Sequence, residues 1–341
     1  MVLITGATGF LGSHLLIHLV EKGEAVRALY RDSSKLEAVR SLFSFYNKEE
    51  LFSKVEWFQA DITAIPSLEL AYVGIEQIYH CAGFISFDLS DEEQLRKVNI
   101  EGTANIVNLA LVHNVDKLCF VSSIAALGDL QEHEDTVTEE TEWNAEKYHS
   151  DYAISKYGAE MEIWRGQQEG LDAVIVNPGV ILGPDYNATG SGKIFLEVKN
   201  GLKYYTKGST GFVAVQDVVH VMYTLMKSDI KGERFILVGE NMPYEKLLKT
   251  IASELKVRGP HIYAQKWLSE IVWRLGWIVS KVFFVNSKLS KAMLKSLYSE
   301  DRYSNQKIRE VNNFEFTDIS DTIIRTAAFY GGDDSGSKVV G

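Results

Sequence analysis

Two residues that could transfer protons lie four positions apart in the stretch HSDYAISKYGAE, residues 149–160. They are Tyr152 and Lys156, and a helix would place the phenol and the ammonium on one face. A buried cation beside a phenol favours the phenolate and lowers the pKa of the tyrosine, which could then exchange protons near neutral pH. The same spacing occurs in ordinary exposed helices, so a catalytic interpretation requires a cofactor and a third polar group.

The serines in the stretch CFVSSIAALG could supply the third polar group. Ser122 and Ser123 end a run that is patterned as a buried strand. In an open parallel sheet the carboxyl ends of the strands face the ligand, so a hydroxyl there would lie beside the nicotinamide end of a bound dinucleotide. The alternative is that both serines only cap the end of the strand.

Glycines at positions 6, 9 and 12 form the pattern TGATGFLG between an expected strand and an expected helix. Gly6 would allow a tight turn, Gly9 would let the backbone approach a diphosphate, and Gly12 would let the helix pack closely on the strand. Free N–H groups and the dipole at the start of the helix would then hold the anion. Because the pattern falls at the first strand–helix junction, it predicts nucleotide binding.

Short apolar runs alternate with helical patterns in the first half of the chain, and these elements must position the polar groups. The runs are VLIT, AVRALY, VEWFQADI, IEQIYHCAG, DKLCFVSS and DAVIVNPG, and Gly23 ends the first helical pattern. The alternation predicts an α/β fold with a doubly wound parallel sheet (Rossmann fold) covered on both faces. We expect a dinucleotide-binding domain at residues 1–183 with parts of 205–240, a mainly substrate-binding region at 184–330, and a disordered tail at 331–341.

Charge and composition argue against several classes of function. The chain of 341 residues has a net charge of −11, which disfavours binding to nucleic acid and to anionic lipid. The sequence shows no secretory signal, and Cys81 and Cys119 lie in apolar runs where a disulfide is not expected. The histidines show no metal-ligand spacing. These features favour a cytoplasmic enzyme without a bound metal.

The end of the second expected strand favours NADPH, with NADH as the second choice. Dinucleotide folds often place an acidic residue there to bind the adenosine ribose. This strand instead ends in ALYRDSSK, with Arg31 at the expected position and Asp32 one or two positions beyond it. A guanidinium suits a 2′-phosphate better than two hydroxyls. The alternative is that Arg31 is a solvated charge and that Asp32 binds the ribose. Asp61 could accept a hydrogen bond from the adenine amino group or cap a helix.

With these residues in place, the chain resembles the extended branch of the short-chain dehydrogenase/reductase superfamily, which includes NAD-dependent epimerases and dehydratases. The matching stretches are TGATGFLG, DI at residues 61–62, HCAG at 80–83, VNIEGT at 98–103, VSS, YAISK, NPGVILGP at 177–184 and VAVQDVV around Asp217. The resemblance is good over roughly residues 1–240 and loose beyond them.

The resemblance implies a role for each matching residue. Tyr152 would be the acid/base, Lys156 would bind the nicotinamide ribose and lower the Tyr152 pKa, and Ser123 would hold the substrate oxygen. Asn99 would support its helix and a proton-relay water. Contacts with the cofactor are expected from Gly6, Thr8, Gly9, Phe10, Leu11, Gly12, Arg31, Asp61, Ile62, Cys81, Ala82, Gly83, Lys156, Pro178, Gly179 and Val180.

Asn177–Pro178 resembles the dihydroflavonol reductase, cinnamoyl-CoA reductase and 3β-hydroxysteroid dehydrogenase-like group of this superfamily. Dehydratases usually carry Thr and acidic residues at the serine position, and epimerases carry an Arg–aromatic–Asn run before the Gly–Pro loop. We therefore expect an NADPH-dependent oxidoreductase that reduces a carbonyl group of a small, apolar or aromatic substrate. The alternatives are an NAD-dependent sugar-nucleotide epimerase and a non-catalytic dinucleotide sensor that binds a partner protein.

Two further segments bear on the substrate and on assembly. Phe84 and Phe87, in the loop FISFDLSDEEQ, favour an apolar or aromatic carbonyl compound as the substrate. Apolar residues recur at helical spacing in KWLSEIVWRLGWIVSKVFF, residues 266–284, and charged residues interrupt them, which predicts a core-facing or lid helix and not a membrane span. A dimer contact or an apolar wall for the substrate is the alternative. Homodimers formed through two long helices are common in the family and are an expectation here.

Overall fold

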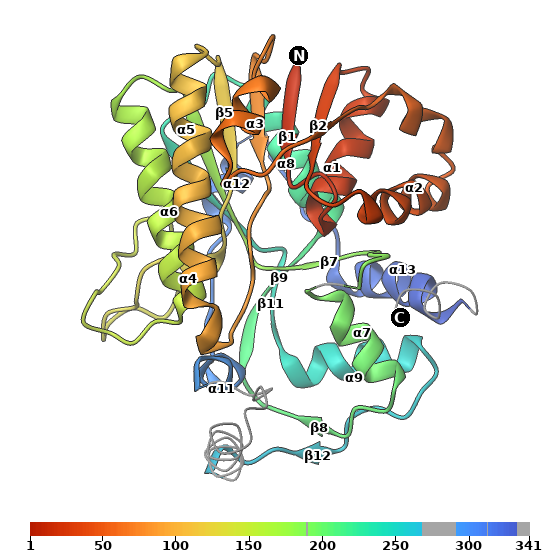
Figure 1. The fold of residues 1–341 in the computed structure, drawn as a ribbon. Coiled ribbons are helices and arrows are strands. Elements are labelled where there is room, and N and C mark those ends of the chain that lie inside the picture. Colours follow the sequence, from red (N-terminus) through yellow and green to blue (C-terminus); the bar gives the residue numbers. More distant parts are fainter. Residues whose placement is uncertain (189, 268–290, 312, 333–341) are drawn as a thin grey trace.

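The computed structural model describes residues 1–188, 190–267, 291–311 and 313–332, and its largest element is a parallel sheet of seven strands (Figure 1). The strands are β1 (Val2–Thr5), β2 (Val26–Tyr30), β3 (Glu56–Gln59), β4 (Gln77–His80), β5 (Lys117–Val121), β6 (Ala173–Pro178) and β10 (Glu233–Leu237). Their order is β10–β6–β5–β4–β1–β2–β3, and every neighbouring pair is parallel. The predicted doubly wound α/β fold is confirmed.

Helices cover both faces of this sheet. They are α1 (Phe10–Glu21), α2 (Leu36–Phe45) and α8 (Val215–Lys227) on one face, and α3 (Ile65–Ala71), α5 (Gly102–Val112) and α6 (Asp151–Gln168) on the other. Successive strand residues point to opposite sides, so Val2 and Ile4 pack in the first layer and Leu3 packs in the second. The strands are apolar on both faces for this reason, as expected of a covered parallel sheet.

A smaller layer follows the large sheet. It contains the three-stranded sheet of β7 (Val180–Leu182), β9 (Ser209–Ala214) and β11 (Glu240–Pro243), the pair β8 (Tyr204–Tyr205) and β12 (Ile262–Tyr263), and the helices α7 (Gly192–Lys199), α9 (Tyr244–Glu254), α11 (Lys291–Tyr298) and α13 (Ile319–Gly331). The short helix α12 (Gln306–Glu310) instead packs against β10 of the large sheet, where Ile308 is buried. Phe195, Phe212 and Ile323 are fully buried in its core. The chain returns to the large sheet through α8 and β10 between these elements.

The end of the first helix and the state of the two cysteines agree with the predictions from the sequence. α1 ends just before Gly23, whose φ of +81° suits a glycine after a helix, as predicted. Cys81 and Cys119 are free thiols. Among the described helices, none is long and apolar enough to span a bilayer. Most of the helix expected at 266–284, and residues 333–341 of the expected tail, lie outside the described residues.

Candidate active site

A tight turn at the end of β1 lies directly against the end of β4. Gly6 has a φ of +68°, a conformation that other residues rarely adopt. A Cβ atom on Gly6 would stand 2.6 Å from the backbone nitrogen of Ala82, and one on Gly12 would stand 2.1 Å from the carbonyl oxygen of Gly6. Both positions therefore require glycine, and the turn, α1 and the end of β4 are in close contact.

The start of α1 fits the diphosphate of a dinucleotide. The helix begins after Gly9, which is exposed and provides no side-chain cap. The N–H groups of Phe10 and Leu11 therefore lie in the first turn without an acceptor within the helix. These N–H groups and the helix dipole attract an anion. The strand order reverses between β1 and β4, which is the position where α/β sheets bind nucleotides.

Arg31 is the cationic group at the carboxyl end of β2, and its side chain is 63% exposed. Its Nη1 atom lies 3.8 Å from Oδ2 of Asp61, which follows β3. Oδ1 of Asp61 accepts hydrogen bonds from the N–H and the hydroxyl of Thr63. Asp32 accepts a hydrogen bond of 2.9 Å from the N–H of Ser34. The side chain of Ser34 and this N–H together lower the pKa of the Asp32 carboxyl. The Asp32 carboxylate is thus engaged by its own turn, whereas Arg31 is accessible.

Ser123, Tyr152 and Lys156 meet at the carboxyl end of β5. α6 carries Tyr152 and Lys156 one turn apart, as their spacing predicts. The Ser123 side chain accepts a hydrogen bond of 3.1 Å from the N–H of Ala125, and its proximity favours a lower pKa of the Tyr152 phenol. Lys156 is buried, and its Nζ donates a hydrogen bond of 2.7 Å to the carbonyl of Val121. Ser123 therefore caps the strand end and lies near the phenol at the same time.

The ionisation of this group differs from the expectation. Burial raises the pKa of Tyr152 above its usual value, and the neighbouring Ser123 offsets only part of the increase. The Lys156 ammonium, which was predicted to lower the Tyr152 pKa, donates to the Val121 carbonyl. Burial also lowers the pKa of Lys156 to about 8, although the negative charge of Glu160 opposes this. At pH 7 the phenol is neutral and the amine is charged.

Asn99 connects the loop after β4 with α6. It lies in a π-helical turn, η4 (Arg96–Glu101), which is a feature common at functional sites. Its side chain accepts a hydrogen bond of 2.7 Å from the N–H of Phe84 and donates one of 2.9 Å to the Phe84 carbonyl. Its Nδ2 also donates to the hydroxyl of Ser155, which donates to the carbonyl of Tyr152. Asn99 thus fixes the position of the loop relative to the helix that carries Tyr152.

The segment of residues 81–83 passes between the glycine turn and Lys156. Its residue Ala82 touches Gly6, and a Cβ atom on Gly83 would stand 3.9 Å from Nζ of Lys156. The expected cofactor contacts at Cys81, Ala82 and Gly83 therefore lie beside the group formed by Ser123, Tyr152 and Lys156.

The remaining expected cofactor contacts lie at other strand ends. Residues 178–180 join β6 to β7, and a Cβ atom on Gly179 would stand 2.4 Å from the carbonyl oxygen of Gly211. Thr8 belongs to the glycine turn. The side chains of Leu11 and Ile62 are buried in apolar clusters, so only their backbone groups could face a cofactor.

His80 lies in a buried hydrogen-bond network that the sequence analysis missed. Its Nδ1 atom is 2.6 Å from the hydroxyl of Thr5, and its Nε2 atom is 3.0 Å from the hydroxyl of Thr103. The Thr5 hydroxyl also accepts a hydrogen bond from the N–H of Ala82. Burial lowers the pKa of His80 to about 3, so the imidazole is a neutral link between β1, β4 and α5.

A buried ion pair behind Lys156 was missed as well. Nη1 of Arg234 lies 3.3 Å from Oε2 of Glu160, whose side chain is 0% exposed. Glu160 also accepts a hydrogen bond from Asn177. Glu160 continues the row of Tyr152 and Lys156 at a spacing of four residues, and this periodicity was the signal available in the sequence.

A nucleotide-binding turn that lies beside a serine, a tyrosine and a lysine at the strand ends is characteristic of NAD(P)-dependent oxidoreductases of the extended short-chain dehydrogenase/reductase type. Comparison with protein families agrees: the model of the NAD dependent epimerase/dehydratase family matches residues 2–239. The chain belongs to this family, as the sequence motifs predicted.

Several curated proteins are similar to the chain. It is 31% identical over 251 residues to Sterol demethylase protein B of Methylococcus capsulatus, covering 72% of each chain. It is 30% identical over 285 residues to a Putative dihydroflavonol 4-reductase of Synechocystis sp., covering 82% of this chain and 78% of that protein. It is 29% identical over 247 residues to Cinnamoyl-CoA reductase 1 of Petunia hybrida, covering 69% of this chain and 72% of that protein.

Solved structures share the whole fold. The crystal structure of gox2253 matches with a TM-score of 0.81 and 25% identity, covering 98% of this chain and 99% of that chain. UDP-glucose 4-epimerase of Thermotoga maritima matches with a TM-score of 0.75 and 19% identity, covering 96% of this chain and 98% of that chain. The second likeness shows the fold alone.

Proposed function

We propose that the protein reduces a carbonyl group, an aldehyde or a ketone, with NADPH as the hydride donor. The observation that supports this most directly is that the Ser123 hydroxyl and a neutral Tyr152 phenol lie at the carboxyl end of β5, where Ser123 acts on the pKa of Tyr152. Two neighbouring hydroxyl groups can both turn toward one substrate oxygen. The names of the relatives, among them dihydroflavonol 4-reductase and cinnamoyl-CoA reductase, support the same reaction class.

The side chains have distinct tasks in this proposal. The bound nicotinamide would supply the hydride to the carbonyl carbon. Ser123 holds the carbonyl oxygen, and Tyr152 donates its proton to that oxygen as negative charge develops. The raised pKa of Tyr152 suits this direction of reaction, since a proton donor must be protonated at neutral pH. Lys156 contributes positive charge beside the reacting oxygen and binds the nicotinamide ribose.

Arg31 supports NADPH as the preferred cofactor. Its guanidinium is exposed at the end of β2, where the adenosine ribose binds in this fold. A 2′-phosphate would accept an ionic hydrogen bond from the Arg31 guanidinium. It would compete with the Asp61 carboxylate for this guanidinium. Asp32, the alternative ribose ligand, is engaged by Ser34.

The wall beside Tyr152 supports an apolar or aromatic substrate. The Phe87 ring meets the Tyr152 ring edge to face, with 5.9 Å between the centroids, and the Phe87 side chain is 43% exposed. An exposed phenyl group at this position offers contact to an apolar substrate body.

The proposed function is tested by titrating the purified protein with NADPH and NADH and then assaying a panel of aldehydes and ketones. We expect tighter NADPH binding and NADPH oxidation with aromatic carbonyls. Arg31→Ala should weaken NADPH binding at least about tenfold and leave NADH binding unchanged. Arg309→Ala, which removes an exposed arginine from α12, is the matched control. Retention of NAD through purification, with no NADPH binding, would instead indicate the sugar-nucleotide epimerase.

A further inference from the structure

An exposed, largely apolar face lies at one end of the molecule, on the small sheet of β8 and β12. The strands pair in parallel, with Tyr204 opposite Ile262 and Tyr205 opposite Tyr263. Because strand side chains alternate, Tyr204 and Ile262 share one face of this sheet, and they are 57% and 40% exposed. Figure 1 shows the two strands at the lower end, far from β1 and the glycine turn.

Aromatic side chains extend this face. Trp267 follows β12 and is 60% exposed, and Tyr263 is 37% exposed. Tyr205 and Tyr263 lie on the other side of the strands, where Nζ of Lys249 stands 5.2 Å from the Tyr205 ring and Nζ of Lys207 stands 5.1 Å from the Tyr263 ring. Clustered exposure of large apolar groups marks an interaction surface, whereas single exposed residues are ordinary. We call Tyr204, Ile262 and Trp267 the β8–β12 face.

The chain around this face is basic, although the protein as a whole is acidic. Residues 199–207 and 256–267 contain no Asp or Glu, and they contain the cations Lys199, Lys203, Lys207, Lys256, Arg258 and Lys266. All six are exposed, and Nζ of Lys199 donates a hydrogen bond of 2.7 Å to the carbonyl of Tyr330. Over the described part of the chain, no carboxylate lies within 4.0 Å of the cationic group of Lys203, Lys256, Arg258 or Lys266. Four cations are thus available beside the exposed aromatic groups.

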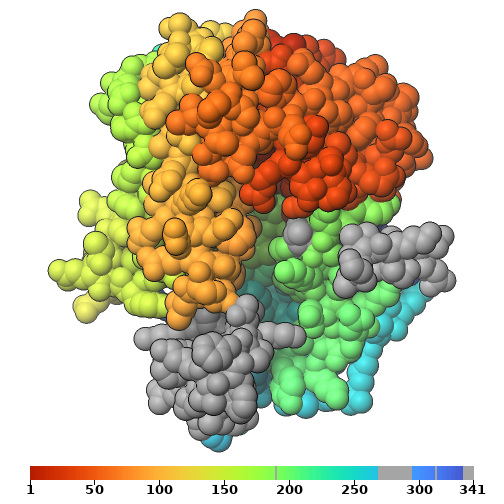
Figure 2. Space-filling view, in the orientation of Figure 1, coloured from red at the N-terminus to blue at the C-terminus, as the bar shows by residue number. Residues whose placement is uncertain are grey.

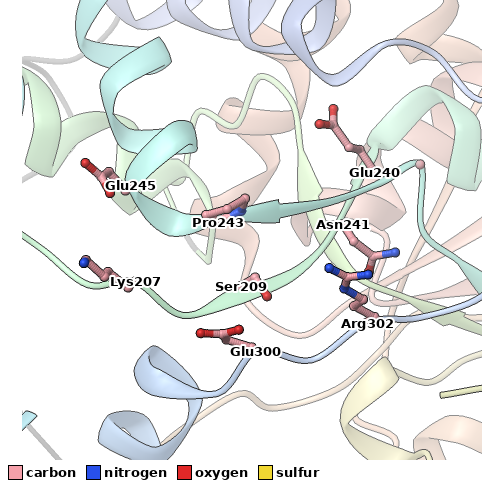
Figure 3. A pocket seen from close by; sticks show the side chains of 9 residues that line it. Lys207, Ser209, Glu240, Asn241, Pro243, Glu245, Glu300 and Arg302 are labelled. Carbon is pink, nitrogen blue, oxygen red and sulfur yellow. The ribbon is translucent and has the colours of Figure 1, made fainter. Parts of the chain in front are cut away.

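Two acidic groups lie near Lys207. Glu245 and Glu300 line, with Lys207, a pocket of about 740 Å³ between β9, β11 and the segment around residue 300 (Figure 3). Glu245 also forms an ion pair of 2.6 Å with Lys249. Lys207 and Lys249 therefore have partners within the protein, and the surplus of positive charge lies with the other cations. None of the residues that line this pocket belongs to the predicted active site.

We propose that the β8–β12 face docks the protein onto a bilayer that contains anionic lipid. Tyr and Trp rings favour the boundary between head groups and acyl chains, since they combine an apolar body with a polar tip. Lysine and arginine beside them bind anionic head groups. The net charge of −11 does not oppose this, because salt screens charges beyond about 8 Å and the bilayer meets only the local basic surface. Figure 2 shows the part of the chain around residue 200, coloured green, at the lower edge of this side of the molecule.

This proposal does not depend on the proposed reaction, and binding alone tests it. The full chain is sedimented with vesicles of phosphatidylcholine, with and without phosphatidylglycerol. We expect it to pellet only with the anionic vesicles and to be released by high salt. Lys203→Glu with Arg258→Glu should reduce binding about tenfold or more, and Tyr204→Ser with Ile262→Ser should also reduce it at low salt.

Matched controls lie at the other end of the molecule. Lys54→Glu removes an exposed cation before β3, and Leu70→Ser removes an apolar side chain of α3 that is 65% exposed. Both should bind like the wild type, and the melting temperatures of all variants establish that they are folded. The proposal is overturned if the protein does not sediment with anionic vesicles or if the β8–β12 variants bind them as well as the controls do. It is also overturned if light scattering shows a dimer that Tyr204→Ser dissociates, since a second copy would then cover the face.

Discussion

Asn177 donates a hydrogen bond of 2.6 Å to the buried carboxylate of Glu160, and the same amide donates one of 3.0 Å to the backbone carbonyl of Ser123. Asn177, the last residue but one of β6, thus connects α6 to the end of β5. Lys156, one turn before Glu160, reaches the same strand end at Val121. Lys156 and Glu160, which lie on one face of α6, are therefore both connected to the end of β5. Lys156 contacts Val121 directly, and Glu160 is connected to Ser123 through Asn177.

Replacement of Glu160 by Gln should alter the pH dependence of the reaction. The carboxylate supports the charged form of Lys156, whose pKa is about 8, so its loss lowers that pKa further. The alkaline limb of the kcat profile should move to lower pH, and kcat at pH 7 should fall about tenfold. NADPH binding should change little. Glu162→Gln, on the exposed side of α6 and paired with Arg165, is the matched control.

A structural role alone would leave the alkaline limb of Glu160→Gln at the wild-type pH, and that outcome contradicts the account. Removal of one partner from a buried ion pair can also unfold a protein. The double variant Glu160→Gln with Arg234→Met removes both charges, and it should show the same shift of the alkaline limb in a protein of near wild-type stability.

Replacement of Lys156 by Met should stabilise the protein while abolishing its activity. Burial lowers the pKa of Lys156 from 10.5 to about 8, which means that the positive charge on Lys156 destabilises the folded state relative to the unfolded state. Because the folded pKa is lowered, this cost is fully present below pH 8 and disappears as the pH rises toward 10.5. Urea denaturation at pH 7 should show a gain of about 2 kcal/mol in the free energy of unfolding.

The pH dependence of that gain is the control. At pH 10 the difference between Lys156→Met and the wild type should shrink, since most of the wild-type amine is then neutral in the folded state. A difference that is negative at pH 7, or that does not change with pH, would show that the charge of Lys156 carries no cost in the fold.

Replacement of Gly6 by Ala should damage cofactor binding and stability together. The new Cβ atom would need a φ of +68° and would stand 2.6 Å from the nitrogen of Ala82. Gly23→Ala is the matched control, because Gly23 has a similar φ of +81° and nothing within 4 Å of its Cβ position. We expect Gly23→Ala to cost about 1 kcal/mol, which is the conformational term alone. Gly6→Ala should cost clearly more and weaken NADPH binding; equal losses in the two variants would contradict the close contact.

The part of the site that depends on local spacing could be predicted from the sequence. Tyr152 and Lys156 follow from a helical period, Ser123 from its place after a buried strand, and Gly6 from its place before a helix. The parallel sheet could be predicted in the same way, from short apolar runs that alternate with helical patterns. Each of these inferences uses residues that are close together in the chain.

The part that depends on distant contacts could not be predicted. Arg234 reaches Glu160 only because β10 pairs with β6, and the chain between them passes through the smaller layer. Burial raises the pKa of Tyr152, and the carbonyl of Val121 that receives the Lys156 ammonium is a backbone group with no signature in the sequence. Spacing therefore located the phenol and the ammonium but could not show how deeply the phenol is buried or which group the ammonium contacts.

The measurement that tests the central claim most directly is single-turnover oxidation of bound NADPH by an aromatic aldehyde in the wild type and in Tyr152→Phe. The account predicts that Tyr152→Phe binds NADPH with wild-type affinity and loses at least about a hundredfold in the rate of oxidation, because only the proton donor has been removed. A variant that oxidises NADPH at the wild-type rate would show that the proton comes from elsewhere and would contradict the proposed mechanism.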